Sequence, residues 1–159
     1  MIPAARAPRP DDDPRYAVAL VCLGNICRSP MADVVLSAAV ADLPVVVASA
    51  GTGGWHVGEP MDRRAAAVLR AHGYDPSGHR ARQFDADWHD RFDLVLAMDE
   101  DNLAALGGPT ERIRLFRSFD PLGPGEVPDP YYGGDDGFEE VLAMVERTAA
   151  ALAEELRGR

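Results

Sequence analysis

Apolar residues recur along the chain in two alternating patterns, which predict strands and helices in turn. Four short runs are almost continuously apolar, which is typical of strands buried on both faces of a parallel sheet; they are residues 16–22, 44–49, 93–98 and 112–116. Between them, apolar residues three and four positions apart predict helices at residues 32–40, 65–72, 99–106 and 135–156. Strands that alternate with helices predict an α/β fold: a single-domain, three-layer structure with a short parallel sheet of about four strands and helices on both faces.

The N-terminal segment departs from this pattern. Residues 1–15 contain four prolines and a run of three aspartates. Such a segment offers too little apolar surface to offset the entropy of ordering it. We therefore expect a disordered tail at residues 1–15 and one folded domain at residues 16–159.

Composition excludes several classes of function. The 16 basic and 26 acidic residues give a formal net charge of −10, which repels nucleic acids and anionic membranes, so we expect neither as a partner. Every basic residue is an arginine, and the absence of lysine excludes Walker-A, Schiff-base and kinase chemistries. The sequence contains no run of about 18 apolar residues, so we expect no membrane span. Residues 1–15 also lack the apolar core of a signal peptide. Two cysteines five positions apart form no disulfide framework, so we expect a cytoplasmic protein.

The first predicted strand runs directly into a loop that is suited to binding an anion. Its sequence from Cys22 to Pro30 is Cys-Leu-Gly-Asn-Ile-Cys-Arg-Ser-Pro, and a helix is predicted just after it. Five residues between Cys22 and Arg28 suffice to curl the backbone around a tetrahedral oxyanion, with N–H groups pointing inward. We expect Gly24 to supply the positive φ that this curl needs, with Asn25 the next most tolerant residue type. The helix N-terminus and Arg28 would favour a bound dianion and a thiolate at Cys22.

An aspartate far along the chain adds a second chemical group. Taken alone, Cys22 is more simply a buried thiol at a strand end. Asp129, however, begins the sequence Asp-Pro-Tyr-Tyr-Gly in a loop before the last predicted helix. Phosphoryl transfer through a cysteine needs an acid to protonate the leaving oxygen, and a loop aspartate that faces the anion can supply it. Without Cys22, residues 129–133 would indicate only an ordinary turn.

Together these motifs resemble the low-molecular-weight protein tyrosine phosphatase family over nearly all of residues 16–157. The segment from Val21 to Pro30 and the Asp-Pro-Tyr-Tyr motif at residues 129–132 carry the resemblance. Shorter matches lie between them, at residues 48–52, 55–56, 79–83 and 97–99. One departure is Asp33, where the family usually has Glu. The resemblance implies a phosphatase domain at residues 16–159, with a phosphate-binding loop after the first strand.

The resemblance also implies a role for each site residue in hydrolysing phosphotyrosine-containing protein substrates to inorganic phosphate. Cys22 would be the nucleophile that forms a phosphocysteine, Arg28 would bind the phosphoryl oxygens, and Asp129 would act as general acid and then general base. The loop backbone would also hold the phosphoryl group, through Leu23, Gly24, Asn25, Ile26, Cys27, Arg28 and Ser29. Ser29 would donate to the Cys22 sulfur, and the supporting network would comprise Asn25, Ser29, Ser49 and His79. Because preorganised donors suffice for this chemistry, we expect no cofactor and no metal.

Other residues admit two interpretations. Cys27 is either a redox partner that traps an oxidised Cys22 as a disulfide, as the family behaviour suggests, or a small buried side chain. Trp55, Tyr131 and Tyr132 are either aromatic walls for a phenyl phosphate or ordinary packing, and the resemblance favours Trp55 and Tyr131 as walls. The remaining histidines have no metal-ligand spacing and are interpreted as surface or helix-face residues; they are His56, His72 and His89.

Three alternative functions keep part of this chemistry. An arsenate reductase would need further cysteines, and none follows Cys27. A protein-arginine phosphatase usually has Thr at the position of Ile26 and lacks the paired tyrosines, so Ile26, Tyr131 and Tyr132 favour phosphotyrosine. A non-catalytic phosphotyrosine-binding or redox-sensing module would have no need for Asp129.

Overall fold

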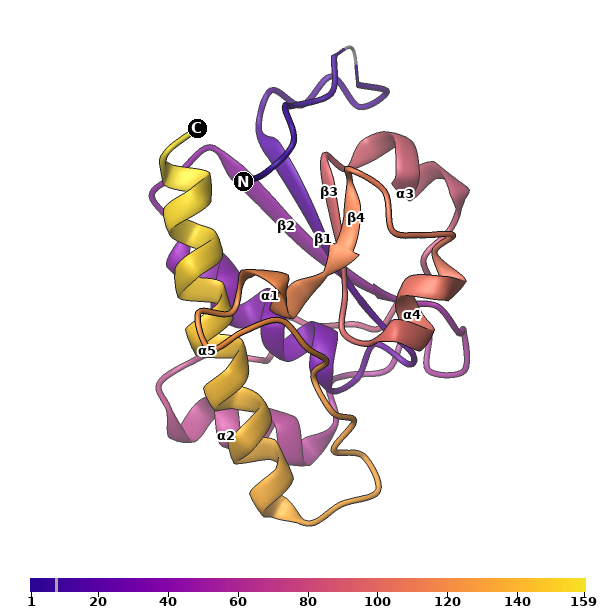
Figure 1. Cartoon of the computed structure of the whole chain (residues 1–159). Coiled ribbons are helices and arrows are strands. Elements are labelled where there is room, and N and C mark those ends of the chain that lie inside the picture. The colour runs from indigo at the N-terminus through magenta and orange to yellow at the C-terminus, as the bar shows by residue number, and fades with distance from the viewer. Residues whose placement is uncertain (8) are drawn as a thin grey trace.

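The computed structural model describes residues 1–7 and 9–159 and shows a four-stranded sheet between two layers of helices (Figure 1). The strands are β1 (Tyr16–Cys22), β2 (Val45–Gly51), β3 (Leu94–Ala97) and β4 (Ile113–Leu115). All of them pair in parallel, in the order β2-β1-β3-β4. The helices are α1 (Arg28–Ala39), α2 (Arg63–Ala71), α3 (Ala86–Arg91), α4 (Glu100–Ala105) and α5 (Asp135–Arg157), with a short 3₁₀ helix, η1 (Phe116–Phe119). The predicted α/β fold is confirmed.

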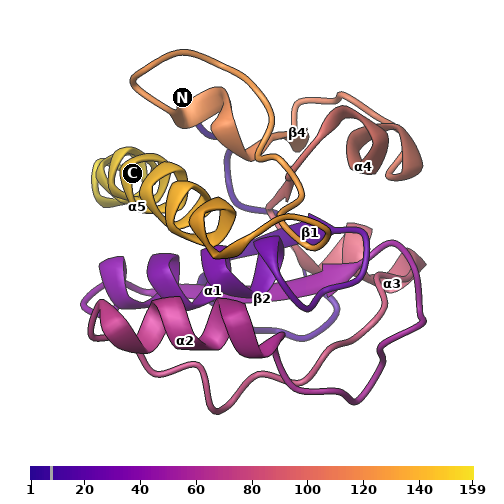
Figure 2. The ribbon, with the colours of Figure 1, turned by 90° about the horizontal axis from the view of Figure 1, so that it is seen from below.

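Strand β1 shows how the sheet is buried on both faces. All seven of its residues are buried, and successive side chains point to opposite sides. The even-numbered residues, from Tyr16 to Cys22, join the core that α1, α2 and α5 cover. The odd-numbered ones, from Ala17 to Val21, join a second core that α3 and α4 cover. Figures 1 and 2 show these two groups of helices on opposite sides of the sheet.

The sequence pattern locates the strands more closely than the helices. All four predicted strands are present, with bounds within two residues of those expected. Helix α1 begins four residues before the predicted periodic stretch, because its first turn is Arg28, Ser29 and Pro30, which show no apolar period. Helix α3 has six residues and one buried side chain, Trp88, so it shows no amphipathic period and is not predicted.

The carboxyl ends of β1, β2 and β3 meet at one edge of the sheet, the usual place for ligand sites in such folds. The loop after β1 leads into α1 there, and Asp99 follows β3. The long segment between η1 and α5 returns to the same edge, where the Val127 N–H donates to the Met98 carbonyl at 2.7 Å. Residues from four separate parts of the chain are thus brought together.

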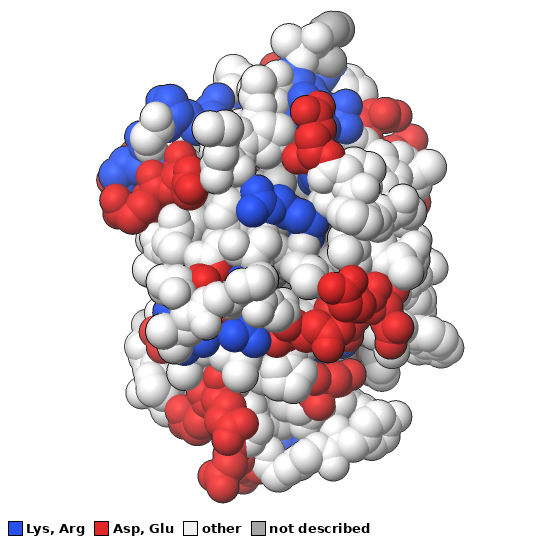
Figure 3. Space-filling view, viewed as in Figure 1, with Lys and Arg blue, Asp and Glu red and all other residues white. Residues whose placement is uncertain are grey.

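Acidic groups dominate part of the surface, consistent with the net charge of −10. On the face shown in Figure 3, red acidic side chains gather in the lower half, where the segment before α5 lies in Figure 1. No basic residue occurs between Arg117 and Arg147. Within the described residues, no helix has both the length and the apolar character that a membrane span requires.

The described residues of the N-terminal segment run back over the amino end of the sheet, opposite the carboxyl edge. The Arg6 backbone N–H donates to Asp93 at 2.6 Å, and the Arg9 guanidinium pairs with the same carboxylate at 3.3 Å. The Tyr16 hydroxyl donates to the Pro3 carbonyl at 2.8 Å. Composition does not suggest these contacts; the disorder expected for residues 1–15 stays a prediction.

Candidate active site

The loop between β1 and α1 curls tightly, and the positive φ lies at Asn25 (57°). Gly24 was expected to take that conformation, and this expectation is wrong, because Gly24 is not among the positive-φ residues. Its lack of a side chain serves another purpose: a Cβ there would lie 3.1 Å from the His56 ring. Asn is one of the few residue types that enter the left-handed region readily, because its short amide can hydrogen-bond locally.

Strand β2 and the residues after it hold this loop in place. The Thr52 and Gly53 N–H groups donate to the carbonyls of Cys22 and Leu23, both at 2.9 Å. A Cβ on Gly51 would lie only 2.6 Å from the Leu23 carbonyl oxygen. The end of β2 therefore packs directly against the loop backbone.

The Cys22 sulfur lies at the start of α1 and is surrounded by donors. It is 2.9 Å from the Ser29 hydroxyl and 3.3 Å from the Asn25 backbone nitrogen. The Asn25 amide donates to the Ser29 oxygen at 2.8 Å, and the Ser29 hydrogen then has two acceptors within reach: the sulfur at 2.9 Å and the more distant Ala50 carbonyl at 3.4 Å. These donors and the helix N-terminus stabilise a negative charge on the sulfur.

Asn25 is the centre of a buried hydrogen-bond network. Its amide also donates to Ser49 at 3.0 Å, and its side-chain oxygen accepts from the Arg82 N–H at 3.0 Å. His79 Nε2 lies 2.7 Å from the Asn25 backbone carbonyl. Since burial lowers the pKa of His79, the ring is neutral at pH 7, and Nε2 carries the hydrogen because a carbonyl can only accept. The structure thus brings together the four residues expected to support the loop.

Arg28 is buried and fixed from one side. Its Nη1 atom donates to Asp99 at 2.6 Å and to the Val127 carbonyl at 3.1 Å. Its Nη2 atom lies 3.6 Å from the Asp129 carboxylate. Burial alone would lower the pKa of Arg28, but the Cys22 sulfur and the carboxylates of Asp99 and Asp129 outweigh this and raise it. The guanidinium is therefore a cation with one edge held by Asp99.

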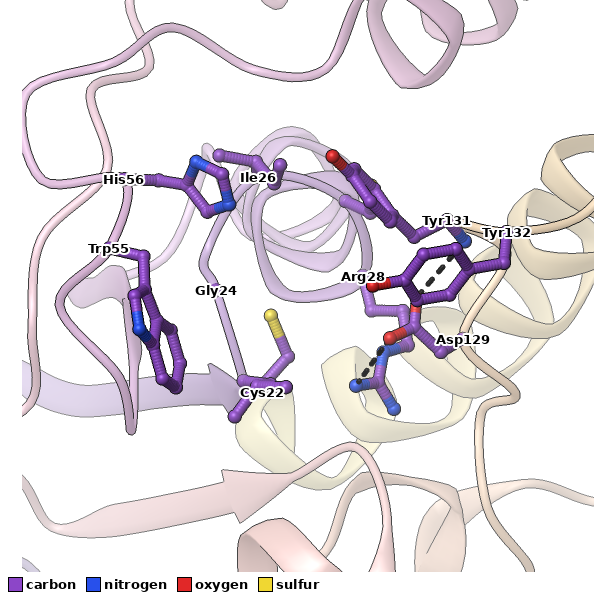
Figure 4. Close-up of a pocket in the computed structure, with 11 residues that line it drawn as sticks. Cys22, Gly24, Ile26, Arg28, Trp55, His56, Asp129, Tyr131 and Tyr132 are labelled. Carbon is purple, nitrogen blue, oxygen red and sulfur yellow. Dashed lines mark hydrogen bonds and ion pairs between the residues drawn. The ribbon is translucent and has the colours of Figure 1, made fainter.

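Cys22, Arg28 and Asp129 open into one pocket of about 330 Å³, which is shown in Figure 4. Its lining comprises Cys22, Leu23, Gly24, Ile26, Cys27, Arg28, Trp55, His56, Asp129, Tyr131 and Tyr132. Trp55 and Tyr131 stand on opposite sides of the pocket, with the Cys22 sulfur between them (Figure 4). Tyr132 packs edge-on against Tyr131, with ring centroids 4.9 Å apart. The floor thus suits a tetrahedral oxyanion and the walls suit an aromatic ring.

Three residues of the site were not identified from the sequence. Asp99, which directs Arg28, could have been found as a carboxylate immediately after a buried strand at the carboxyl edge. His56 was interpreted as a surface residue, but it lines the pocket and pairs through Nδ1 with Glu59 at 2.8 Å. The Arg82 N–H gives no sequence signal. The other two surface histidines have partners outside the pocket: His72 pairs with Glu139, and His89 packs against Phe84.

Cys27 is buried on the same loop, and both cysteines are free thiols. Burial raises the pKa of Cys27 far above its ordinary value, with the nearby Asp62 carboxylate adding to the effect. Cys27 is therefore a neutral thiol at pH 7.

Comparisons with known proteins agree with this geometry. The family model described as low molecular weight phosphotyrosine protein phosphatase matches residues 17–159. A low molecular weight protein-tyrosine-phosphatase of Streptomyces coelicolor is 52% identical, covering 91% of this chain and 98% of the relative. A crystal structure of a protein tyrosine phosphatase from Entamoeba histolytica superposes with a TM-score of 0.84 at 33% identity, covering 90% and 97% of the two chains. Wzb of Vibrio vulnificus, solved in complex with benzylphosphonate, gives 0.81 at 27% identity, covering 88% and 98%.

The fold, the pocket and these relatives define a hydrolase of the protein-tyrosine phosphatase class. More narrowly, the chain belongs to the low molecular weight phosphotyrosine protein phosphatase family. The family resemblance that the sequence motifs carried is thereby confirmed.

Proposed function

We propose that the protein hydrolyses phosphotyrosine in protein substrates through a phosphocysteine intermediate on Cys22. In the first step the Cys22 thiolate attacks phosphorus, the bond to the phenolic oxygen breaks, and Asp129 gives its proton to that oxygen. In the second step Asp129 takes a proton from water, the water oxygen attacks phosphorus, and the thiolate leaves with inorganic phosphate as the other product. The charge that spreads over the phosphoryl oxygens is stabilised by Arg28 and the loop N–H groups.

The observation that carries this proposal is the convergence of three groups on one pocket. The sulfur of Cys22 and the guanidinium of Arg28 come from the loop between β1 and α1, and the carboxylate of Asp129, far along the chain, faces the same space. A binding module has a use for the cation but none for the acid. The hydroxyl of Ser29 at 2.9 Å supports the thiolate both before attack and as the leaving group of the second step.

Substrate class follows from the walls of the pocket. Trp55 and Tyr131 flank a space that a phenyl ring fills, and the sulfur lies at its base. A phosphotyrosine reaches the sulfur while its ring contacts both walls, whereas a phosphoserine is too short to do so. The benzylphosphonate bound to Wzb likewise joins a phenyl ring to a phosphorus-containing dianion, through one methylene group. We therefore expect phosphotyrosine peptides to be hydrolysed faster than phosphoserine or phosphoarginine peptides.

Two substitutions test the mechanism. Cys22→Ser should abolish turnover of an aryl phosphate. It should still bind vanadate or phosphate, because the anion-binding loop is unchanged. Asp129→Asn should lower the rate by about 10² to 10⁴ with a poor leaving group, the range of general acid catalysis. A Cys22→Ser variant that still turns over near the wild-type rate would refute the nucleophile, and an unchanged rate for Asp129→Asn would refute the acid.

We also propose Cys27 as the thiol that traps an oxidised Cys22. Oxidation of Cys22 by peroxide to a sulfenic acid would be followed by attack of Cys27, with loss of water and formation of a disulfide. In excess peroxide, inactivation should then be reversed by dithiothreitol in the wild type, whereas in Cys27→Ala a second peroxide oxidises the Cys22 sulfenic acid to a sulfinic acid, which dithiothreitol does not reduce. Inactivation of the wild type that dithiothreitol does not reverse would count against this role.

A further inference from the structure

Arg64, in the first turn of α2, reaches across to the loop that carries Asp129. Its Nη2 atom donates to the Tyr131 carbonyl at 2.7 Å and its Nη1 atom to the Gly133 carbonyl at 3.2 Å. Among the described residues, these are the only side-chain hydrogen bonds to the carbonyls of residues 130–134. All side chains of residues 131–136 are exposed, so the loop has few other packing contacts that could fix it.

The Arg64 guanidinium is itself held in a fixed orientation. Asp62, which caps the N-terminus of α2, accepts from Arg64 Nε at 3.2 Å and from Nη2 at 3.3 Å. The guanidinium also stacks on two aromatic rings, 4.7 Å from the Phe138 centroid and 5.6 Å from the Tyr131 centroid. Arg64 thus makes directed contacts on both edges and on its faces.

Asp62 connects this clamp to the phosphate-binding loop. Its backbone N–H donates to the Ile26 carbonyl at 2.9 Å, within the loop that holds Cys22. A continuous set of hydrogen bonds therefore runs from Ile26 through Asp62 and Arg64 to Tyr131, two residues after Asp129. At the far end, the Tyr131 N–H donates to the Asp129 carboxylate at 3.1 Å.

We propose that Arg64 is a positioning residue that sets the distance and orientation of Asp129 relative to Cys22. This inference rests on the proposed function, in which Asp129 is the general acid. Arg64 does not line the pocket, so it acts through the Tyr131 and Gly133 carbonyls and touches no reacting atom. Proton transfer requires hydrogen-bond geometry to the leaving oxygen, and a misplacement of about 1 Å can cost as much as 10²-fold in rate.

The chemistry of the clamp requires arginine. A guanidinium is planar and has several N–H donors in fixed directions. It can therefore donate to two carbonyls and a carboxylate while it stacks on two aromatic rings. A lysine at this position would keep the charge and one donor, but it would lose the fork and the stacking. Lys is therefore an informative conservative replacement, and Met, which keeps the length of the stem, removes the polar clamp.

The experiment compares Arg64→Met and Arg64→Lys with Arg63→Met, whose exposed side chain belongs to the same helical turn and makes no hydrogen bond to the loop. For each variant, kcat/KM is measured with phenyl phosphate, a poor leaving group, and p-nitrophenyl phosphate, a good one. We expect Arg64→Met to lower kcat/KM about tenfold with phenyl phosphate and less than twofold with p-nitrophenyl phosphate, because a good leaving group needs little help from an acid. Arg64→Lys should fall between, and Arg63→Met should match the wild type.

A second arm places Arg64→Met in the Asp129→Asn background. Without the acid there is nothing left to position, so the double variant should be no slower with phenyl phosphate than Asp129→Asn alone. Equal losses with both leaving groups, or additive losses in the double variant, would show a merely structural role and overturn the inference. If Arg64→Met does not fold, the leaving-group comparison for Arg64→Lys decides by the same criterion.

The two proposals fail in different ways. If Asp129→Asn lowers the rate with phenyl phosphate and the Arg64 variants do not, the inference about Arg64 is wrong and the proposed mechanism stands. If Asp129→Asn leaves the rate unchanged, Asp129 is not the acid, and the role of Arg64 is overturned together with it.

Discussion

Asp99 uses one carboxylate oxygen to direct Arg28 and the other to cap α4. Its Oδ2 atom accepts from Arg28 at 2.6 Å, and its Oδ1 atom accepts from the Asn102 N–H at 2.7 Å. The helix cap fixes the carboxylate, and the carboxylate in turn fixes the guanidinium that faces the pocket. Asp99, which is outside the pocket lining, therefore fixes the orientation of the guanidinium that we propose binds the phosphoryl group.

Replacing Asp99 by Asn keeps an N-cap of good propensity but removes the charge that pairs with Arg28. A charge-assisted hydrogen bond contributes about 1.5–3 kcal/mol, so we expect kcat/KM to fall by about tenfold and vanadate to bind correspondingly more weakly. Steady-state kinetics with vanadate inhibition check both effects. Asp101→Asn, an exposed position in the same helix, is the control and should behave as the wild type. Unchanged vanadate inhibition in Asp99→Asn would contradict the directing role.

A second prediction concerns Gly51 and the shape of the phosphate-binding loop. A methyl group there would lie 2.6 Å from the Leu23 carbonyl oxygen and 3.1 Å from the Asn25 nitrogen, both of which are backbone atoms of the phosphate-binding loop. Gly51→Ala must push the loop away from β2, at a cost of about 1–3 kcal/mol in stability. We expect the fold to persist and kcat/KM to drop more than tenfold, measured alongside circular dichroism.

The control for Gly51 is Gly78→Ala. A Cβ at Gly78 meets no atom within 4 Å, and its φ is not positive. The same glycine-to-alanine change should therefore leave kcat/KM as it is. Full activity in Gly51→Ala would mean that the loop tolerates displacement, and the tight packing against β2 would then have no functional consequence.

The sequence alone predicts the sheet and the nucleophile loop well, for a physical reason. Strands buried on both faces must be apolar at every position, so β1 is visible as an uninterrupted run from Tyr16. The loop at Cys22 and the turn at Asp129 are contiguous motifs and need no knowledge of tertiary contacts. The family resemblance then placed both at one site, and the structure brings them into one pocket.

The remaining contacts could not be predicted because they join residues far apart in the sequence. Arg64 is one of two adjacent arginines at the start of a helix, and only the path of the segment before α5 distinguishes it from Arg63. His56 has no periodic pattern, and its place in the pocket depends on where β2 ends. The positive φ was expected at Gly24 on general propensity, whereas Asn25 takes it and uses its amide for the network.

A pH-dependent prediction follows from Asp120, which joins η1 to α5. Its carboxylate is buried and accepts from Arg147 at 2.7 and 2.8 Å and from Arg117 at 2.9 Å. Hydrogen bonds from Arg147 lower the pKa of Asp120 far below its ordinary value, and burial opposes this only partly. Because the pKa is lower in the folded state, the stabilisation is complete above about pH 4, the unfolded value, and is lost as the pH falls toward the folded pKa.

Urea unfolding at pH 3, 5 and 7 checks this prediction. Asp120→Asn should lower the free energy of unfolding by about 3 kcal/mol at pH 7, as expected for breaking a buried ion pair. The difference from the wild type should shrink between pH 5 and pH 3, because the Asp120 carboxylate of the unfolded wild type takes up protons over this range while that of the folded protein stays ionised. Glu140→Gln, an exposed carboxylate on α5, is the control and should change little. A difference that stays constant across this range would show that the Asp120 charge does not matter.

The last prediction concerns the N-terminal segment, whose composition predicts disorder but whose contacts indicate packing against the domain. The Asp93 carboxylate has no exposed surface and accepts from the Ala17 N–H at 2.7 Å and from Arg9 at 3.3 Å. Among the described residues, Arg9 is the only cation paired with it, and its side chain is 5% exposed. Arg9→Met would leave a buried carboxylate without its cation, so we expect the free energy of unfolding to fall by about 3 kcal/mol. The activity of the folded enzyme should be unchanged, since this segment lies at the edge of the sheet opposite the pocket.

Arg15→Met is the matched control, because Arg15 is exposed and its one ion pair within residues 1–7 and 9–159 is with Asp13 of the same segment. Surface ion pairs of this kind contribute about 0–1 kcal/mol, so this variant should unfold at nearly the wild-type urea concentration. A packed segment therefore predicts a clear gap between the two variants. A disordered tail, which residues 1–15 suggest by their prolines and aspartates, predicts that neither substitution changes the unfolding midpoint. Equal midpoints for Arg9→Met, Arg15→Met and the wild type would thus decide for disorder and against the Arg9–Asp93 pair.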